Sequence, residues 1–369
     1  MENIIKKSRL KSLFRNMVDI YSPSGKEEDI TEFLASYLHE KGLPVTLREV
    51  SDGRRNVEVV FSDKAPSVAF IGHIDTVPAF DIDDYEFAEQ DGRVYGLGTA
   101  DMKGGCAAMI EAFVSQVQTG RIPHDAGLFL VVGEEETGDG TAALIKSRSF
   151  PWAIVAEPTD LAVCLGHYGY SEMLVQSHGT RRHASLGSQQ YNAVFSMLQM
   201  LLKLAEFITS DYSQVVMNIR DIHSSSAGFA VPGSCESFVD FHLPPEIQVR
   251  KITKKIKALV EEAFSDSLLT NYSIEFPTMA NSYQLEDKGL LPEILQKIYG
   301  QLGYQWHPTA FRSHSDANLL WQANCSPIIL GPGQLEAAHT RDESIDFEQV
   351  VQAAQLYREI LESLISRSK

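Results

Sequence analysis

Short apolar runs, each the length of a buried strand and followed by polar residues, alternate with helical patterns along much of this chain. Such runs occupy residues 67–71, 127–132 and 152–155. Apolar residues recur at helical spacing in 30–38, where residues 24–27 have the spacing of a capping box, and again in 104–113. Strands that alternate with helices predict an α/β domain with a mostly parallel sheet.

The middle of the chain has a different pattern. It predicts a strand at 172–176, a helix at 192–208, strands at 215–219 and 236–242, a helix at 252–264 and a strand at 272–276. This order is that of a ferredoxin-like α+β sandwich. After residue 282 the first pattern resumes, with a helix at 289–302, a strand at 327–330 and a helix at 347–364. The sequence therefore predicts one domain formed by residues 1–169 and 283–369, with a second domain, 170–282, inserted into it.

Composition limits the classes of function. The 369 residues are 44% hydrophobic and 22% charged, the balance of a globular protein. No apolar run approaches the length of a membrane span and the N-terminus lacks a signal peptide, so we expect a cytoplasmic protein that does not bind membranes. The net charge of −17 argues against nucleic acid. Four cysteines without a CxxC pair leave histidines and carboxylates as the candidate metal ligands.

Polar residues follow several of the predicted strands, where ligands bind in open α/β sheets. Candidate segments are residues 72–75, 98–105, 134–136 and 156–159, with 338–343 near the C-terminus. Each has an ordinary structural interpretation: a histidine in a turn at His73, a helix cap at Asp101, a solvated acidic run at 134–136. The acidic run directly follows an apolar strand, however, where adjacent carboxylates repel unless a cation neutralises one of them and another acts as a base. Asp75 lies two residues after His73, on the same side of the strand, and can support it as a ligand.

Taken in order, these segments resemble a dizinc family that includes acetylornithine deacetylase, succinyl-diaminopimelate desuccinylase, aminoacylase and glutamate carboxypeptidase. The matching segments are GHIDTVP, GLGTADMKGG, GEEETGDG, AEPT, RRHASLG, LGPG and AHTRDES, and they span nearly the whole chain. The resemblance implies a zinc-hydrolase catalytic domain with an inserted lid and dimerisation domain. It also implies a homodimer that binds two Zn²⁺ per chain, with Co²⁺ as a possible substitute.

The resemblance also implies roles for single residues. His73 and Glu157 would hold one zinc, Glu135 and His339 the other, and Asp101 would bridge both. Glu134 would be the base that activates water, Asp75 would orient His73, and His183 would stabilise the oxyanion in the site of the partner subunit. A shifted assignment, with Glu135 as the base and Glu136 as the ligand, stays open, although the distance to Gly140 and Thr141 favours the first.

The inserted domain departs from the family pattern. Relatives usually carry Asn where this chain has Phe229 and Arg where it has His242, positions that help to bind substrate carboxylates. A neutral histidine lacks the forked donors of a guanidinium, and Arg182 is a candidate replacement. Asp316 and Gly333 resemble residues that line the substrate pocket, although Asp316 also suits a helix cap. The departures predict an unusual acyl group or side chain, or weak carboxylate recognition, unless these positions face solvent.

These observations predict a metal-dependent amide hydrolase that removes the acyl group from an N-acyl amino acid. Acetylornithine, acetyl-lysine and succinyl-diaminopimelate are examples of such substrates. A metallo-dipeptidase or carboxypeptidase is the alternative, because the same metal site hydrolyses either amide bond. A non-catalytic binding protein with a relict site is the alternative from another class, against which the complete set of predicted ligands argues.

Overall fold

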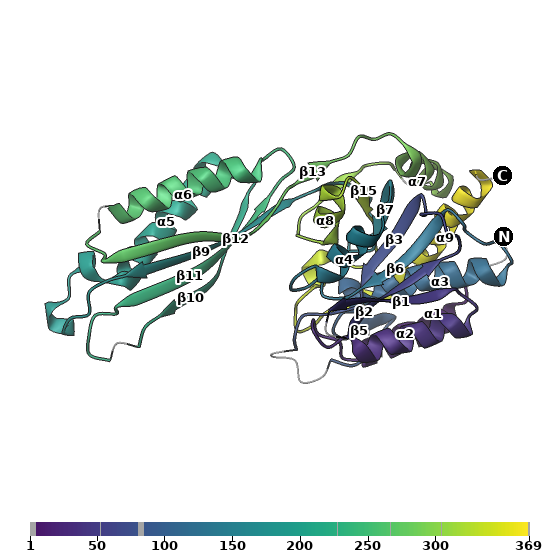
Figure 1. Ribbon diagram of the computed structural model, residues 1–369, viewed down its shortest axis with the longest axis horizontal. Helices are drawn as coiled ribbons and strands as arrows, with labels where there is room; N and C mark the ends of the chain where they lie inside the picture. The colour runs from purple at the N-terminus through teal and green to yellow at the C-terminus, as the bar shows by residue number, and fades with distance from the viewer. Residues whose placement is uncertain are drawn as a thin grey trace. The chain divides into compact units, whose positions relative to one another are not determined.

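The computed structural model describes residues 5–51, 53–79, 85–226, 228–265, 267–303 and 305–367 (Figure 1). It divides into two compact units. The first comprises residues 1–165, 285–311 and 315–369, and the second comprises 166–284 with the short segment 312–314. The boundaries predicted from the sequence, 169/170 and 282/283, lie within a few residues of these. The sequence does not predict that residues 312–314 belong to the second unit.

The first unit is built on a mixed sheet with a parallel centre. Its nine strands follow the order β1-β2-β6-β3-β7-β15-β8-β13, with β14 paired to β8. In chain order they are β1 Val45–Ser51, β2 Arg54–Val60, β3 Val68–His73, β6 Ala126–Val131, β7 Trp152–Val155, β8 Cys164–His167, β13 Tyr283–Gln284, β14 Thr309–Phe311 and β15 Ser326–Ile329. β3 runs parallel to β6 and β7, and β7 runs parallel to β15. These central strands are the predicted apolar runs, which confirms the mostly parallel α/β fold.

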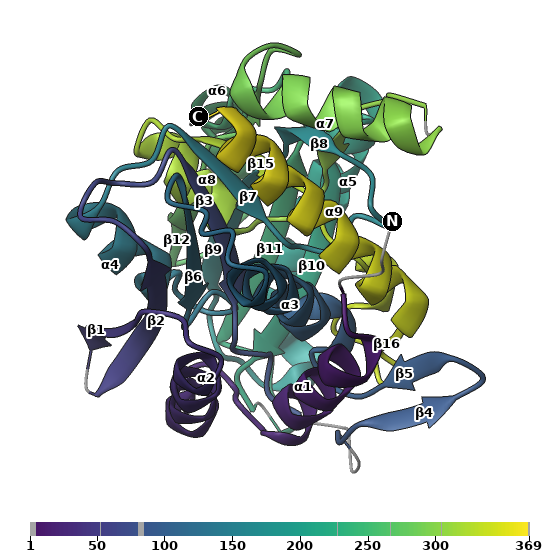
Figure 2. The ribbon, with the colours of Figure 1, turned by 90° about the vertical axis from the view of Figure 1, so that its right-hand side faces the viewer.

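Helices cover this sheet. They are α1 Lys7–Asp19, α2 Glu28–Glu40, α3 Gly104–Gln118, α4 Asp139–Ser147, α7 Leu290–Leu302, α8 Asp316–Gln322 and α9 Phe347–Arg367. α3 packs between the central strands and α9, and α1 packs beside both, as Figure 2 shows. α3 is apolar and buried along almost its whole length because it is covered on both sides. A small second sheet joins β16 (Ser344–Asp346), β5 (Arg93–Tyr95) and β4 (Ala88–Gln90).

The second unit has the predicted ferredoxin-like order. Its elements are β9 Gly169–His178, α5 Ala193–Asp211, β10 Val216–Ser224, β11 Ser234–Leu243, α6 Val249–Ser265 and β12 Asn271–Ala280. The four strands form an antiparallel sheet in the order β10-β11-β9-β12. Burial alternates along β9, since one face of the sheet packs under the two helices. The prediction of an inserted α+β domain is confirmed.

Among the described residues, α5 is the one helix whose length and hydropathy would suit a membrane span. Its buried side chains, among them Met197, Leu201 and Leu204, belong to the hydrophobic core that the sheet and α6 share. A core helix of this kind has the same composition as a spanning helix, because its inner face must be apolar to pack on a sheet.

One predicted helix start is wrong. The capping box expected at residues 24–27 is absent, because α2 begins at Glu28 and no side chain caps it. Glu27 is buried instead and accepts two hydrogen bonds from the guanidinium of Arg54, at 2.6 and 2.9 Å. The Ser24 hydroxyl donates to the carboxylate of Asp75, 2.6 Å away. Both polar groups therefore serve long-range contacts rather than the helix end.

Candidate active site

Parallel strands bring the predicted residues to one edge of the first unit's sheet. β3 ends at His73, β6 ends just before Glu134 and Glu135, and β7 ends just before Glu157. Because β3 lies between β6 and β7 and runs parallel to both, these strand ends are adjacent. Two further segments complete the group: residues 99–103 before α3, which carry Asp101, and the loop after β15, which carries His339.

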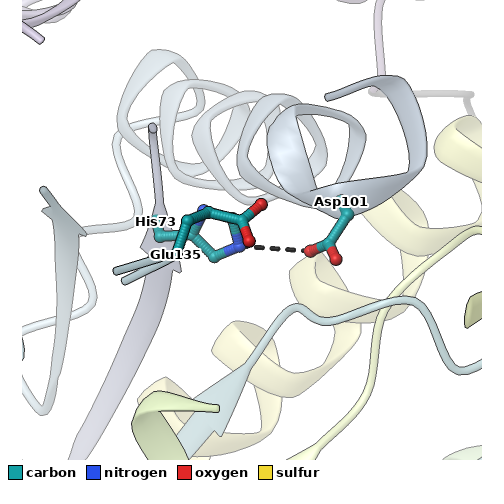
Figure 3. A group of neighbouring side chains, drawn as sticks. All are labelled: His73, Asp101 and Glu135. Atoms are coloured by element: carbon teal, nitrogen blue, oxygen red, sulfur yellow. Dashed lines mark hydrogen bonds and ion pairs between the residues drawn. The ribbon is translucent and has the colours of Figure 1, made fainter. Parts of the chain in front are cut away.

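Asp101 lies between the two histidines. Its Oδ1 is 3.1 Å from Nε2 of His73, and its Oδ2 is 3.5 Å from Nε2 of His339. The same nitrogen of His339 is 3.0 Å from the carboxylate of Glu135. Figure 3 shows the side chains of His73, Asp101 and Glu135 pointing toward one another. One carboxylate that presents a different oxygen to each of two imidazoles has the geometry of a bridging ligand.

Glu157 and Glu134 stand on the His73 side of this cluster. Their closest carboxylate oxygens lie 4.0 and 3.9 Å from Nε2 of His73. The other oxygen of Glu157 is buried and has no hydrogen-bond partner among the described residues. Buried polar atoms are almost always paired, so this oxygen fits a role as a ligand of a cation.

The cluster concentrates buried negative charge. Burial raises the pKa of Glu134 and of Glu157 well above their usual values, and neighbouring carboxylates add to both shifts. Burial opposes the ionisation of Asp101 as well, but the hydrogen bond with His73 lowers the pKa of Asp101. His73, Asp101 and Glu135 offer ligand atoms within 4.8 Å of one another. Imidazole nitrogens among carboxylate oxygens are the donors that zinc prefers, so the site fits divalent cations.

Asp75 contacts both His73 and the turn that carries the glutamates, and its role in orienting His73 stays a prediction. Nδ1 of His73 lies 3.1 Å from the backbone carbonyl of Asp75 and 3.5 Å from its carboxylate. The backbone oxygen is thus the nearer partner of the ring, and a proton on Nδ1 leaves Nε2 free as a ligand. The Asp75 carboxylate accepts the N–H groups of Glu134 and Glu135, each at 3.1 Å. Asp75 therefore fixes the turn that carries both glutamates.

The three consecutive glutamates are separated by exposure. Glu134 and Glu135 point toward the histidines with side chains only 10% and 6% exposed, whereas Glu136 is exposed. This arrangement favours Glu134 and Glu135 over the alternative pair of Glu135 and Glu136.

Two predicted substrate residues lie in the first unit. Asp316 is buried at the start of α8, and its Oδ1 has no hydrogen-bond partner among the described residues. It does not cap the helix, because the side chain of Ser315 does so. Burial raises the pKa of Asp316 to about 7. Gly333 has a φ of +94°, and its position lies against Ala100, where a side chain would come within 3.3 Å. Their predicted contact with substrate stays a prediction.

The other predicted residues lie in the second unit. His183 is exposed, and its Nδ1 accepts the Ser185 N–H and lies 2.7 Å from the Ser185 hydroxyl, an arrangement that keeps the ring proton on Nε2. The guanidinium of Arg182 stacks on the ring of Tyr191, 4.1 Å from its centre. The ring of His242 packs against that of Tyr170, and burial lowers the pKa of His242. Phe229 is 92% exposed. The predicted roles of Arg182, His183 and His242 stay predictions.

Two further buried charged residues, Lys103 and Glu343, adjoin the cluster. The sequence does not indicate either of them as a site residue. The ammonium of Lys103 donates to the backbone carbonyl of Ile20 at 2.8 Å, and burial lowers the pKa of Lys103 to about 7. Glu343 receives backbone N–H groups from the loop that carries Asp101. Both residues lie in segments that were recognised, two and four residues from Asp101 and His339, but nothing in the sequence indicates their burial.

Known proteins resemble this chain over nearly its full length. Residues 69–363 match the family model described as peptidase family M20/M25/M40. A probable carboxypeptidase of Aspergillus clavatus is 26% identical over 394 residues, which cover 100% of this chain and 91% of that protein. An acetylornithine deacetylase of Vibrio campbellii is 25% identical over 339 residues, which cover 86% of this chain and 87% of that protein.

Solved structures share the fold. A tripeptidase from Staphylococcus aureus matches with a TM-score of 0.83 and 22% identity, covering 98% of this chain and 100% of that one. A Bacillus subtilis protein described as a dinuclear metal binding peptidase from the M20 family matches with a TM-score of 0.71 and 14% identity, covering 98% of each chain. The family match spans most of the chain and includes the cluster around Asp101. The chain therefore belongs to peptidase family M20/M25/M40 and is a metal-dependent hydrolase.

Proposed function

We propose that this hydrolase removes the acyl group from the nitrogen of an N-acyl amino acid, with two zinc ions at the cluster. The observation that carries the proposal is the position of Asp101, which presents one oxygen to His73 and the other to His339. A carboxylate that bridges two metal ions is expected where both ions act on one amide bond. The acetylornithine deacetylase similarity supports the acyl amino acid as the substrate class.

The ligands divide between two ions. His73 and Glu157 would hold one, Glu135 and His339 the other, and Asp101 both. The unpartnered oxygen of Glu157 and the short contact between His339 and Glu135 support this division. We propose zinc because nitrogen and carboxylate donors suit it, and cobalt is expected to substitute because it accepts the same donors.

The chemistry follows from the remaining carboxylate. Held by these ligands, the two ions would polarise the amide carbonyl and would lower the pKa of the attacking water toward about 7. Glu134 then takes the proton of the attacking water on its carboxylate and passes it to the amine nitrogen as the C–N bond breaks. Asp75 holds Glu134 in place through the Glu134 N–H, so the base is fixed relative to the cluster.

We further propose that the protein is a cytoplasmic homodimer and that Arg182, His242, Asp316 and Gly333 each contact the substrate. The family resemblance supports Asp316 and Gly333, and the unpartnered buried oxygen of Asp316 supports a polar contact there. His242 stands where relatives usually carry Arg, and Arg182 is the candidate replacement for that cation. His242 lacks a guanidinium fork, so we expect weak recognition of acyl groups that end in a carboxylate.

His183 supplies a test that is independent of the ligands. Because Ser185 keeps the ring proton of His183 on Nε2, His183 can donate a hydrogen bond to an oxyanion. Removal of one such donor costs about 10²- to 10³-fold in kcat. We expect His183→Ala to lower kcat by this amount while both ions stay bound. The control is His223→Ala, which removes an exposed histidine of β10 in the same unit. Equal kcat for the two variants would refute the proposed role.

Peptide hydrolysis is the second candidate function. The probable carboxypeptidase and the tripeptidase among the similar proteins favour it. The deciding experiment measures amine release from N-acetyl and N-succinyl amino acids and from dipeptides, with zinc or cobalt supplied. Turnover of acyl amino acids supports the proposal, and turnover of dipeptides alone supports the peptidase. A protein that binds metal but turns over no member of the panel would contradict both.

A further inference from the structure

Glu343 is buried, with 3% of its surface exposed, and its carboxylate accepts three backbone N–H groups. Oε2 accepts from Gly98 at 2.9 Å, and Oε1 accepts from Ala100 at 2.8 Å and from Asp101 at 3.0 Å. Hydrogen bonds to a charged acceptor are stronger than neutral ones. One side chain thus holds the backbone of the loop that presents Asp101, including the amide of Asp101 itself.

This loop cannot satisfy those amides alone. Gly98 has a φ of +78°, and Asp101 has extended rather than helical dihedral angles, so the regular hydrogen bonding of a helix does not begin until α3. Buried N–H groups without partners are costly. Without the carboxylate of Glu343, three such groups would lie unpaired beside Asp101, and the loop would be expected to shift.

Glu343 also belongs to the segment that carries His339, four residues earlier. Its N–H donates to the carbonyl of Thr340 at 3.3 Å, and its own carbonyl accepts the N–H of Gly96 at 3.2 Å. The next residue begins β16, which pairs with β5. Side chain and backbone of Glu343 therefore join the segment of His339 to the segment of Asp101.

We propose that Glu343 is a positioning residue for the metal centre. Its side chain and backbone fix Asp101 and His339 at the spacing that one ion requires. The inference rests on the proposed function, since it concerns the ion held by Glu135, His339 and Asp101. The other ion shares Asp101 but depends on Glu343 less, because its two remaining proposed ligands, His73 and Glu157, lie at the ends of strands β3 and β7 in the centre of the sheet. Loss of Glu343 should therefore weaken the binding of one ion selectively.

The test is the binding of Zn²⁺ to metal-stripped protein, measured by competition with a chromophoric chelator. Glu343→Gln keeps the volume of the side chain but turns an N–H₂ group toward a backbone N–H. We expect the Kd of one ion to rise by about 10- to 100-fold, as when other partners of metal ligands are changed, with the second ion little affected. Added zinc should restore turnover of the variant. The control, Asp342→Asn, makes the same charge change at an exposed neighbour and should leave both Kd values unchanged.

Different results have different meanings. Unchanged Kd values in Glu343→Gln overturn the inference. An equal rise in the Kd of both ions, together with loss of the circular dichroism signal of the folded protein, also overturns it, because that result marks a purely structural role. If Glu343→Gln does not fold, Glu343→Asp replaces it, since it keeps the charge and shortens the side chain by one carbon. Glu343→Asp should again weaken one ion, and two unchanged ions would overturn the inference. A wild-type protein that binds fewer than two ions refutes the proposed function itself.

Discussion

Replacing Glu134 with glutamine is expected to lower kcat by about 10²- to 10⁴-fold, the usual contribution of a general base. The amide has nearly the same shape as the carboxylate but cannot accept the proton of the attacking water. Glu134 lies 3.9 Å from His73 and holds neither ion in the proposed division of ligands, so both ions should stay bound. Steady-state kinetics together with metal analysis of the purified variant test this expectation.

Glu136→Gln is the matched control for this variant. It makes the same chemical change two residues along the same turn, at an exposed position, and should leave kcat unaltered. If Glu136→Gln were inactive and Glu134→Gln fully active with two ions bound, the assignment of base and ligand would be wrong.

Asp101→Asn is expected to lower both the activity and the metal content. Among the described residues, the Asp101 carboxylate is the one that lies within 3.5 Å of ring nitrogens of both His73 and His339, so its neutralisation should remove a ligand charge from both ions at once. A metal ion contributes several kcal/mol to transition-state stabilisation, so loss of the pair should lower kcat/KM by about 10³-fold or more. The variant should also retain fewer than two ions after dialysis.

Asp63→Asn serves as the control because it makes the same change at an exposed position of the same unit. It should keep two ions and the full kcat/KM. Normal metal content and activity in Asp101→Asn would show that Asp101 is not the bridge.

The core of the fold could be predicted from the sequence because burial determines composition there. β3, β6 and β7 are continuous apolar runs because the sheet is covered by helices, and such runs are distinct even in a single sequence. The same reasoning found the order of elements in the second unit. Short and partly exposed elements were missed, among them β1, β4, β5 and α8, since their patterns are no stronger than those of loops.

Long-range polar contacts could not be predicted. Residues 24–27 have the spacing of a capping box, yet Glu27 pairs with Arg54 and Ser24 with Asp75, contacts that only the folded chain creates. Glu343 and Ala100 are 243 positions apart, and no local pattern connects them. The metal-site residues are predictions that rest on the resemblance of local segments to the family pattern, whereas the contacts of Glu343 and Ser24 join segments that are distant in the sequence.

Asp75 shows the limit of periodicity at the site. Alternation along a strand correctly predicted that it lies near His73. The closest contact of the ring is with the Asp75 backbone carbonyl, at 3.1 Å, whereas the Asp75 carboxylate lies 3.5 Å away and also accepts the N–H groups of Glu134 and Glu135. The strand ends at this point, so the direction of the side chain depends on the turn after β6 rather than on β3 alone.

The central claim is that hydrolysis depends on two ions at the cluster around Asp101. The most direct measurement adds Zn²⁺ stepwise to chelator-stripped protein and records bound metal and amine release from an N-acyl amino acid at each step. We predict no turnover without metal, full turnover near two ions per chain, and no recovery in Asp101→Asn. Full turnover by metal-free protein, or saturation of activity in Asp101→Asn at the same metal concentration, would contradict the account.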